Sequence, residues 1–369
     1  MDILTVIILL GIVHGFFLGF ILLSIRRENQ DANRVLGILI ILFSYVLHPF
    51  FFRGTDLYEK LPHLIMTAHP IVFLLSPLFL FYVKTLTSNT IKFKKIYFSH
   101  LIPFILYVMY LVPFFLKNAD EKFRILQDDV SGIGKIEYLI MIAVPIQVFG
   151  YLILAYRTAK KYNRYLKDSF SSIEKINLDW IQTNITWFFV LGAVMSINAL
   201  LFINGFENFV ILNSGIVAPI IVVLIIYSIG YQGLLQPEIF MTSVEKPRKY
   251  KKTNLESDKA KKYLENLISY MESEKPYIKN NLTLKNLSEM SAIPYYHLSR
   301  IINENLEQNF FDFVNRYRIE EAKEKLLNPE FNHYSILGIA QDVGFNSKSA
   351  FNVAFKKYTD KTPSQFRSE

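Results

Sequence analysis

Two short stretches near the C-terminus carry side chains that could bind base edges and phosphates. In Tyr295–Asn305, apolar Leu298 and Ile301 share one face, so the helix they predict turns a polar face outward. That face carries Tyr295, Tyr296, Ser299, Arg300 and Asn303. Arginine can donate two hydrogen bonds to guanine, and hydroxyl and amide groups can bond to other bases. Alternatives remain open, because Arg300 could hold a phosphate or form a surface salt bridge and Tyr296 could pack locally.

The second stretch begins after Gly344 and has the same character. Phe351 and Phe355 are expected to face a core, which leaves outward Asn346, Ser347, Lys348, Ser349 and Asn352. Of these, Lys348, Ser349 and Asn352 are the candidates for base edges. Lys356 and Lys357 suit phosphate contacts and could equally be solvated surface lysines.

Both stretches follow a shorter helical segment and a turn. The first unit predicts helices at about 283–290 and 295–305, and the second predicts helices at about 335–342 and 347–358. Each unit has the form of a helix-turn-helix, with Leu287 and Ile339 as equivalent core positions. The segment between them, "NFFDFVNRYRIEEAKEKLLN", predicts a helix from 310 to 327, about 27 Å long. Successive major grooves lie about 34 Å apart, so this helix could hold two recognition helices one DNA turn apart.

These last hundred residues resemble the DNA-binding domain of AraC/XylS-type transcriptional regulators. The resemblance rests on "YHLSR", "FFDFVNRYRIEEAKEKLL", "IAQDVGFNSKSAFNVAFKK" and "KTPSQFR", which occur in the family's order and spacing. It implies double-stranded DNA as partner, with Tyr296, Ser299 and Arg300 as base-reading positions, and RNA polymerase is a further expected partner. Glu307 and Asp360 stand where the family usually has glycine. Val353 stands where arginine is common, so the second recognition helix is expected to rely on phosphate and apolar contacts.

The rest of the chain is apolar enough to predict a membrane domain. The protein is 51% hydrophobic with a mean hydropathy of +0.25, and the apolar residues are concentrated before residue 237. A helix needs about 20 apolar residues to span a bilayer. Seven segments satisfy this length, at about 3–25, 32–52, 63–86, 96–116, 135–157, 184–204 and 210–233.

Charge in the connecting loops predicts the orientation of these spans. Loops 26–34, 84–95 and 157–183 hold thirteen Lys and Arg residues, whereas the alternate loops hold six. Basic loops face the cytoplasm, so we expect an N-terminus outside and a C-terminal domain inside a bacterial cytoplasmic membrane. The resulting architecture is all-α, with a seven-helix membrane bundle followed by a cytoplasmic tandem helix-turn-helix. This combination resembles the membrane-bound members of the family.

Composition divides the chain at residues 1–236, 237–280 and 281–369. The middle part contains a basic run at 246–252 and continues as an amphipathic helix through Tyr263, Leu267 and Met271. That helix could pack on the domain that follows or pair with its twin in a homodimer. The basic run is a cytoplasmic flank or a contact with anionic lipid headgroups.

Nothing in the spans has the spacing of a catalytic or metal site. Their polar residues are His14, His48, His69, Gln147, Asn184 and Asn198, which could form an effector pocket or hydrogen bonds between helices. The chain has no cysteine, and we expect no cofactor, no metal and no enzyme activity. The leading hypothesis is a membrane-integral transcription regulator, expected to activate, that couples a membrane or envelope signal to promoter binding. The alternatives are a transporter or membrane enzyme with an accessory domain, or an anchor joining DNA to the membrane.

Overall fold

The computed structural model describes residues 1–25, 30–55, 57–87, 95–128, 135–174, 176–235 and 257–368. Helices are the only regular elements in these ranges, which confirms the predicted all-α class, and one isolated antiparallel bridge joins Phe170 to Thr283. The predicted basic run at 246–252 lies outside the described residues. The chain forms two compact units, the first of Met1–Lys160 with Leu178–Glu245 and the second of Lys161–Asn177 with Lys246–Glu369.

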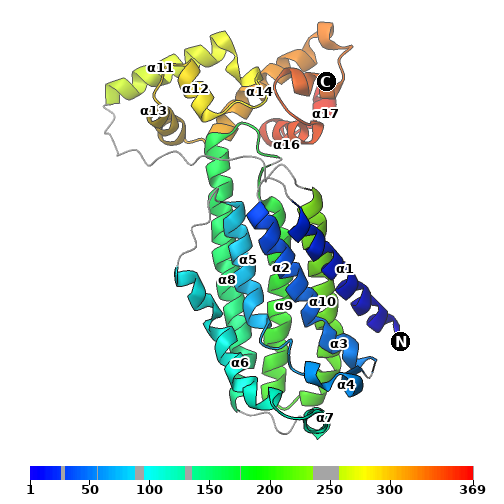
Figure 1. Ribbon diagram of the computed structural model, residues 1–369. Coiled ribbons are helices and arrows are strands. Elements are labelled where there is room, and N and C mark those ends of the chain that lie inside the picture. Colours follow the sequence, from blue (N-terminus) through cyan, green and yellow to red (C-terminus); the bar gives the residue numbers. More distant parts are fainter. Residues whose placement is uncertain are drawn as a thin grey trace. The chain divides into compact units, whose positions relative to one another are not determined.

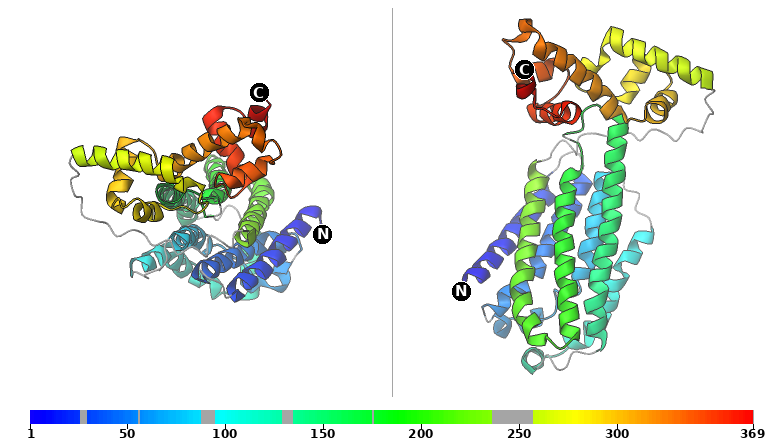
Figure 2. Two further views of the ribbon diagram at one scale, coloured as in Figure 1. Left: turned by 90° about the horizontal axis from the view of Figure 1, so that it is seen from above. Right: turned by 180° about the vertical axis from the view of Figure 1, so that it is seen from behind.

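The long helices of the first unit run side by side (Figures 1 and 2). The α-helices of this unit are α1 (Ile3–Ser24), α2 (Gln30–Val46), α3 (His48–Arg53), α4 (Leu57–Lys60), α5 (Val72–Leu86), α6 (Ile102–Phe115), α7 (Ala119–Asp128), α8 (Lys135–Ser169), α9 (Asp179–Ile203) and α10 (Glu207–Leu235). The last turns of α8, from Lys161 onward, belong to the second unit.

Six helical segments of the described residues are long and apolar enough to cross a membrane. They correspond to all the predicted spans except the third. In that region a 3₁₀ turn at Pro62–Leu64 and further turns precede α5, which has 15 residues. A helix of that length rises about 22 Å, less than the hydrocarbon core of about 30 Å. The count of seven crossings therefore stays a prediction.

Small residues bring α1 and α2 close together. A Cβ on Gly37 would lie 2.8 Å from the carbonyl oxygen of Gly19, so a larger side chain would push these helices apart. Gly11 has the same role toward α10, where a Cβ would lie 2.6 Å from Val223. Packing through small residues is the usual way in which helices associate in lipid.

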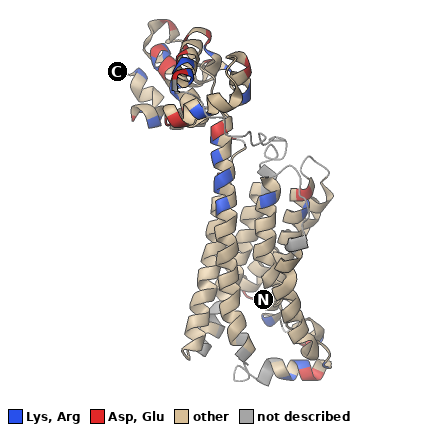
Figure 3. Cartoon of the chain, turned by 90° about the vertical axis from the view of Figure 1, so that its left-hand side faces the viewer, with Lys and Arg blue, Asp and Glu red and all other residues tan. Residues whose placement is uncertain are grey.

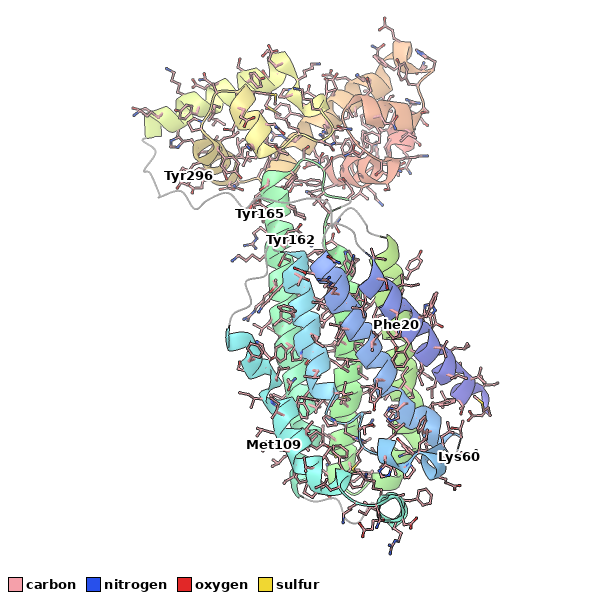
Figure 4. All side chains as sticks on the ribbon, in the orientation of Figure 1. Phe20, Lys60, Met109, Tyr162, Tyr165 and Tyr296 are labelled. Carbon is pink, nitrogen blue, oxygen red and sulfur yellow. The ribbon has the colours of Figure 1, made fainter. Side chains whose placement is uncertain are left out.

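Large apolar side chains cover the outside of the first unit. Phe20 on α1 is 60% exposed, Met109 on α6 is 65% exposed and Ile146 on α8 is 66% exposed (Figure 4). Water-soluble monomers rarely expose continuous apolar surface on this scale. The surface favours contact with lipid.

The second unit is built around one helix that serves two hydrophobic cores. Its helices after residue 256 are α11 (Ser257–Glu274), α12 (Leu284–Met290), α13 (Tyr295–Arg300), α14 (Phe310–Leu327), α15 (Ile336–Asp342), α16 (Lys348–Thr359) and α17 (Pro363–Arg367). The first part of α14 packs against α11, α12 and α13, and its last part packs against α15 and α16. The predicted limits of α14 are confirmed at both ends.

The predicted core residues of both helix-turn-helix motifs are fully buried. Leu287 and Leu298 lie in the first core, and Ile339, Phe351 and Phe355 lie in the second. Complete burial of each such side chain contributes about 1.5–3 kcal/mol. In the first core, Leu267 and Met271 of α11 are also buried, so α11 packs on the domain that follows it.

Arg318 lies where the two cores meet and is fully buried. Its Nε donates to the carbonyl oxygen of Tyr277 at 2.8 Å, and a terminal nitrogen donates to that of Lys279 at 2.9 Å. The terminal nitrogens also donate to the carbonyl and hydroxyl oxygens of Ser171, both at 3.1 Å. Its guanidinium lies over the Phe345 ring at 5.5 Å. Burial lowers the pKa of Arg318 to about 10, so it stays charged at neutral pH.

Replacing Arg318 should destabilise the second unit. We expect Arg318→Met to cost about 3 kcal/mol, because buried carbonyl groups would lose their donors. Hydrogen exchange of residues 257–368 in the full-length protein measures this, with exposed Arg316→Met on the same helix as control. Equal protection in both variants would show that Arg318 is dispensable.

Two residues that stand where the resembling family usually has glycine adopt the left-handed backbone conformation that glycine favours. Glu307 has φ 51° and Asp360 has φ 57°, both left-handed. We expect Glu307→Gly to stabilise the unit by about 0.5–1 kcal/mol and Asp360→Gly by less, since aspartate tolerates this conformation better. Glu324→Gly, inside α14, should instead destabilise by about 1 kcal/mol. Thermal unfolding distinguishes the three, and a lower midpoint for Glu307→Gly would refute the strain.

Candidate nucleic-acid interface

The first helix-turn-helix motif places its candidate residues on α13 and on the π-helical turn Ile301–Asn305 that continues it. Leu298 and Ile301 point into the core, whereas Tyr296, Ser299 and Arg300 are partly exposed and Asn303 is exposed. Pro294 precedes the helix and fixes its entry, and the turn before it contains Ala292 at φ 53°. The helix therefore turns a polar face away from the core, with Tyr296 labelled on it in Figure 4.

Arg300 already has a partner on its own helix. Its Nε donates to Glu304 at 2.6 Å, an ion pair between residues four apart. Asn303 donates to the carbonyl oxygen of Ser299 at 2.9 Å. Of the alternatives for Arg300, the surface salt bridge is the arrangement in the structure. Exposed pairs of this kind are worth less than about 1 kcal/mol, so DNA could displace the carboxylate.

Tyr295 is placed differently from its neighbours. It is half-buried, and its hydroxyl lies within hydrogen-bonding reach of the Ser169 side chain at the end of α8. Burial raises the pKa of Tyr295, and the charge of Asp168 raises it further. Tyr295 thus faces the end of α8, a contact that the sequence pattern did not predict.

In the second helix-turn-helix motif, Gly344 makes a close turn before α16. It has φ 97°, and a Cβ there would lie 2.6 Å from the carbonyl oxygen of Tyr277. Ser347 then caps α16, because its side chain accepts from the Ala350 amide at 3.2 Å. Ser347 is therefore committed to the fold, and Asn346 donates to Asn281 at 3.4 Å.

The remaining candidates on α16 face outward. Lys348, Ser349 and Lys356 are exposed, and Asn352 is partly exposed. Val353 is 73% exposed, so the position where relatives often carry arginine is on the surface. Lys357 pairs with Asp312 at 2.6 Å, which ties α16 to the start of α14. The N-terminus of α16 also favours an anion such as a phosphate.

The two outward faces are both carried by helices that pack on α14. α13 packs with the first part of α14 and α16 with its last part, and α14 rises about 27 Å between its ends (Figure 1). Two further contacts join the two helix-turn-helix motifs: Asn281 with Asn346, and Gly344 with Tyr277. This arrangement can present two polar helices to neighbouring turns of DNA.

The polar residues of the first unit are used mainly between helices. Asn184 donates to Gln232 at 2.6 Å and accepts from Ser228 at 3.1 Å, which joins α9 to α10. Gln147 donates to the Phe73 carbonyl oxygen at 2.8 Å, and His14 stacks on Tyr227. His48 bonds to the carbonyl oxygens of Tyr45 and Leu64, whereas Asn198 is partly exposed on α9 and His69 lies in a turn. In the part of the chain that is described, acidic and histidine side chains form no cluster that could hold a metal.

Sequence reasoning missed Arg318 and the residues that contact it from the end of α8. Arg318 occupies the apolar stripe of α14 at the spacing of Val314 and Ala322, a signal that could have marked it as buried. Ser171 has no such signal, since its contact with Arg318 joins residues 147 positions apart.

Comparison with known proteins finds similarity to helix-turn-helix domains. Residues 287–369 match a family model described as a helix-turn-helix domain. An uncharacterised HTH-type transcriptional regulator of Staphylococcus aureus strain COL is 37% identical over 89 residues, which are 24% of this chain and 12% of that protein. The Msm operon regulatory protein of Streptococcus mutans is 28% identical over 90 residues, which are 24% of this chain and 31% of that protein.

These similarities are confined to the C-terminal part. The match covers about an eighth of the length of the staphylococcal relatives, and no solved structure matches the chain. The C-terminal part of the chain thus contains a helix-turn-helix domain similar to those of transcriptional regulators.

Proposed function

We propose that this protein is a membrane-integral transcription regulator that binds specific DNA sequences and activates promoters in response to a membrane or envelope signal. The observation that carries the proposal is the pair of outward polar helices, α13 and α16, held on α14. Arg300, Ser299 and Tyr296 of the first helix and Lys348, Ser349 and Asn352 of the second are the base-reading groups.

The charge of the domain suits specific rather than indiscriminate binding. Residues 246–369 carry a net charge of about +5, and several lysines and arginines pair with acidic groups of the same unit. A net charge of this size predicts modest non-specific affinity. Specificity then depends on the side chains that reach base edges.

The apolar helices of the first unit support the membrane part of the proposal. In it, seven spans cross a bacterial cytoplasmic membrane, the N-terminus lies outside, and the DNA-binding domain lies in the cytoplasm. The basic loops supply the orientation, and the exposed apolar side chains supply the lipid contact. RNA polymerase would be the partner of an activator placed there.

Substitution of the base-reading residues tests the proposal. Full-length protein in lipid nanodiscs would first enrich a duplex of about 40 base pairs, four helical turns, from a random library. We expect Arg300→Ala and Lys348→Ala each to weaken binding to that duplex by about tenfold, or 1.4 kcal/mol. Lys262→Ala, on the exposed side of α11, serves as the control. Failure to enrich any sequence would contradict the proposal.

The ion pair of Arg300 gives a prediction of opposite sign. Glu304→Gln should strengthen binding by about fivefold, equivalent to about 1 kcal/mol, because it frees the guanidinium and removes a negative charge facing phosphate. Affinity should also fall more steeply with salt concentration. The matched control is Glu265→Gln on α11, which is exposed. Unchanged affinity for Glu304→Gln would mean that Arg300 does not reach the DNA.

A further inference from the structure

The segment Lys161–Asn177 belongs to the same compact unit as the helix-turn-helix domain, although the sequence places it between two apolar stretches. Its first part is the end of α8, and the described residues after Ser169 form a bridge, a bend and turns. Phe170 pairs with Thr283 as an antiparallel bridge, and the Ser171 amide donates to the Leu282 carbonyl oxygen at 3.0 Å. The Ser172 hydroxyl donates to Asn280 at 2.9 Å.

This segment also completes the environment of Arg318. Ser171 accepts from both terminal nitrogens of the guanidinium and is 1% exposed. The segment therefore reaches the junction between the two helix-turn-helix units. The segment is held by hydrogen bonds from both its backbone and its side chains.

The surface that the segment covers is the one that would meet DNA. Thr283 is the N-cap of α12, and first helices of this motif lie across the phosphate backbone with their successors in the groove. Tyr295 begins α13, where base contacts are made, and lies against Ser169. Asp168 adds a negative charge beside Tyr295, which would repel a phosphate. A DNA backbone that lay there would meet the docked segment.

We propose that Lys161–Asn177 is an intramolecular competitor of DNA, which holds the domain inactive until it detaches. The inference rests on the proposed function and concerns the regulation of the same interface. Because the segment is tethered, a few hydrogen bonds suffice to keep it bound at high effective concentration. α8 is continuous from Lys135 to Ser169, so a shift in its apolar part would move the docked residues. The signal thus reaches the domain through α8.

The basic character of α8 supplies a rival outcome. Lys161, Arg164 and Lys167 are exposed on its end, where Figure 3 shows successive blue bands. If these cations contacted phosphates while the segment stayed docked, docking would strengthen DNA binding instead of weakening it. The test must therefore lock the segment in place and measure the sign of the effect.

A reversible disulfide provides that lock. The chain has no cysteine, so Phe170→Cys with Thr283→Cys introduces a unique pair. The amide of Ser171 bonds to the residue before Thr283, which makes the bridge a non-hydrogen-bonded pair with Cα atoms about 4.5 Å apart. That separation lies within the range of disulfides. Each single cysteine variant controls for its own substitution, including loss of the Thr283 cap.

The double variant is assayed as full-length protein in nanodiscs with the enriched duplex, oxidised and then reduced in the same sample. We expect oxidation to weaken binding at least about tenfold and reduction to restore it, because locking removes the binding-competent state. Ser172→Ala, which removes the hydroxyl donor to Asn280 and leaves the acceptors of Arg318 in place, should bind more tightly than the unaltered protein. Equal binding in both redox states, or tighter binding when oxidised, would overturn the competition while leaving the proposed function intact. No binding by any variant, reduced or released, would instead refute the proposed function.

Discussion

The buried guanidinium of Arg318 is the constraint on which the second unit depends. A charge removed from water is costly unless its hydrogen bonds are satisfied. Here the acceptors come from three separate parts of the chain, namely Tyr277 and Lys279 before the first helix-turn-helix, Ser171 after α8, and Asn315 on α14 itself. Satisfying this one group therefore fixes where the two cores and the end of α8 lie with respect to each other inside the unit.

The functional consequence is that reading and regulating DNA use the same framework. α14 sets the separation of α13 and α16, and Arg318 stands midway along it. Ser171, which accepts from Arg318, follows Phe170, which pairs with Thr283, and Ser169, which lies beside Tyr295 at the start of the first motif. A change at Ser171 is thereby felt at the junction of the two motifs rather than at one of them.

Local signals predicted much of this unit. The apolar stripes located α14 and α16 to within a residue. Both helices begin at a side-chain cap, because Asn309 and Ser347 accept from amides three residues on. The left-handed Glu307 and Asp360 were indicated by glycine at the same places in the resembling family. The third apolar segment was less well predicted, because its proline-containing start forms turns and leaves α5 at 15 residues. Arg318 with Ser171 could not be foreseen, since periodicity does not encode a contact over 147 residues.

The most direct test of the account is the pattern of backbone protection on DNA. Hydroxyl-radical footprinting of the enriched duplex with the unaltered full-length protein would report where each motif lies. Two polar helices on an arm of about 27 Å should protect two patches on one face of the duplex, separated by about 10 base pairs. A single protected patch, or patches on opposite faces, would contradict reading by both motifs of one domain.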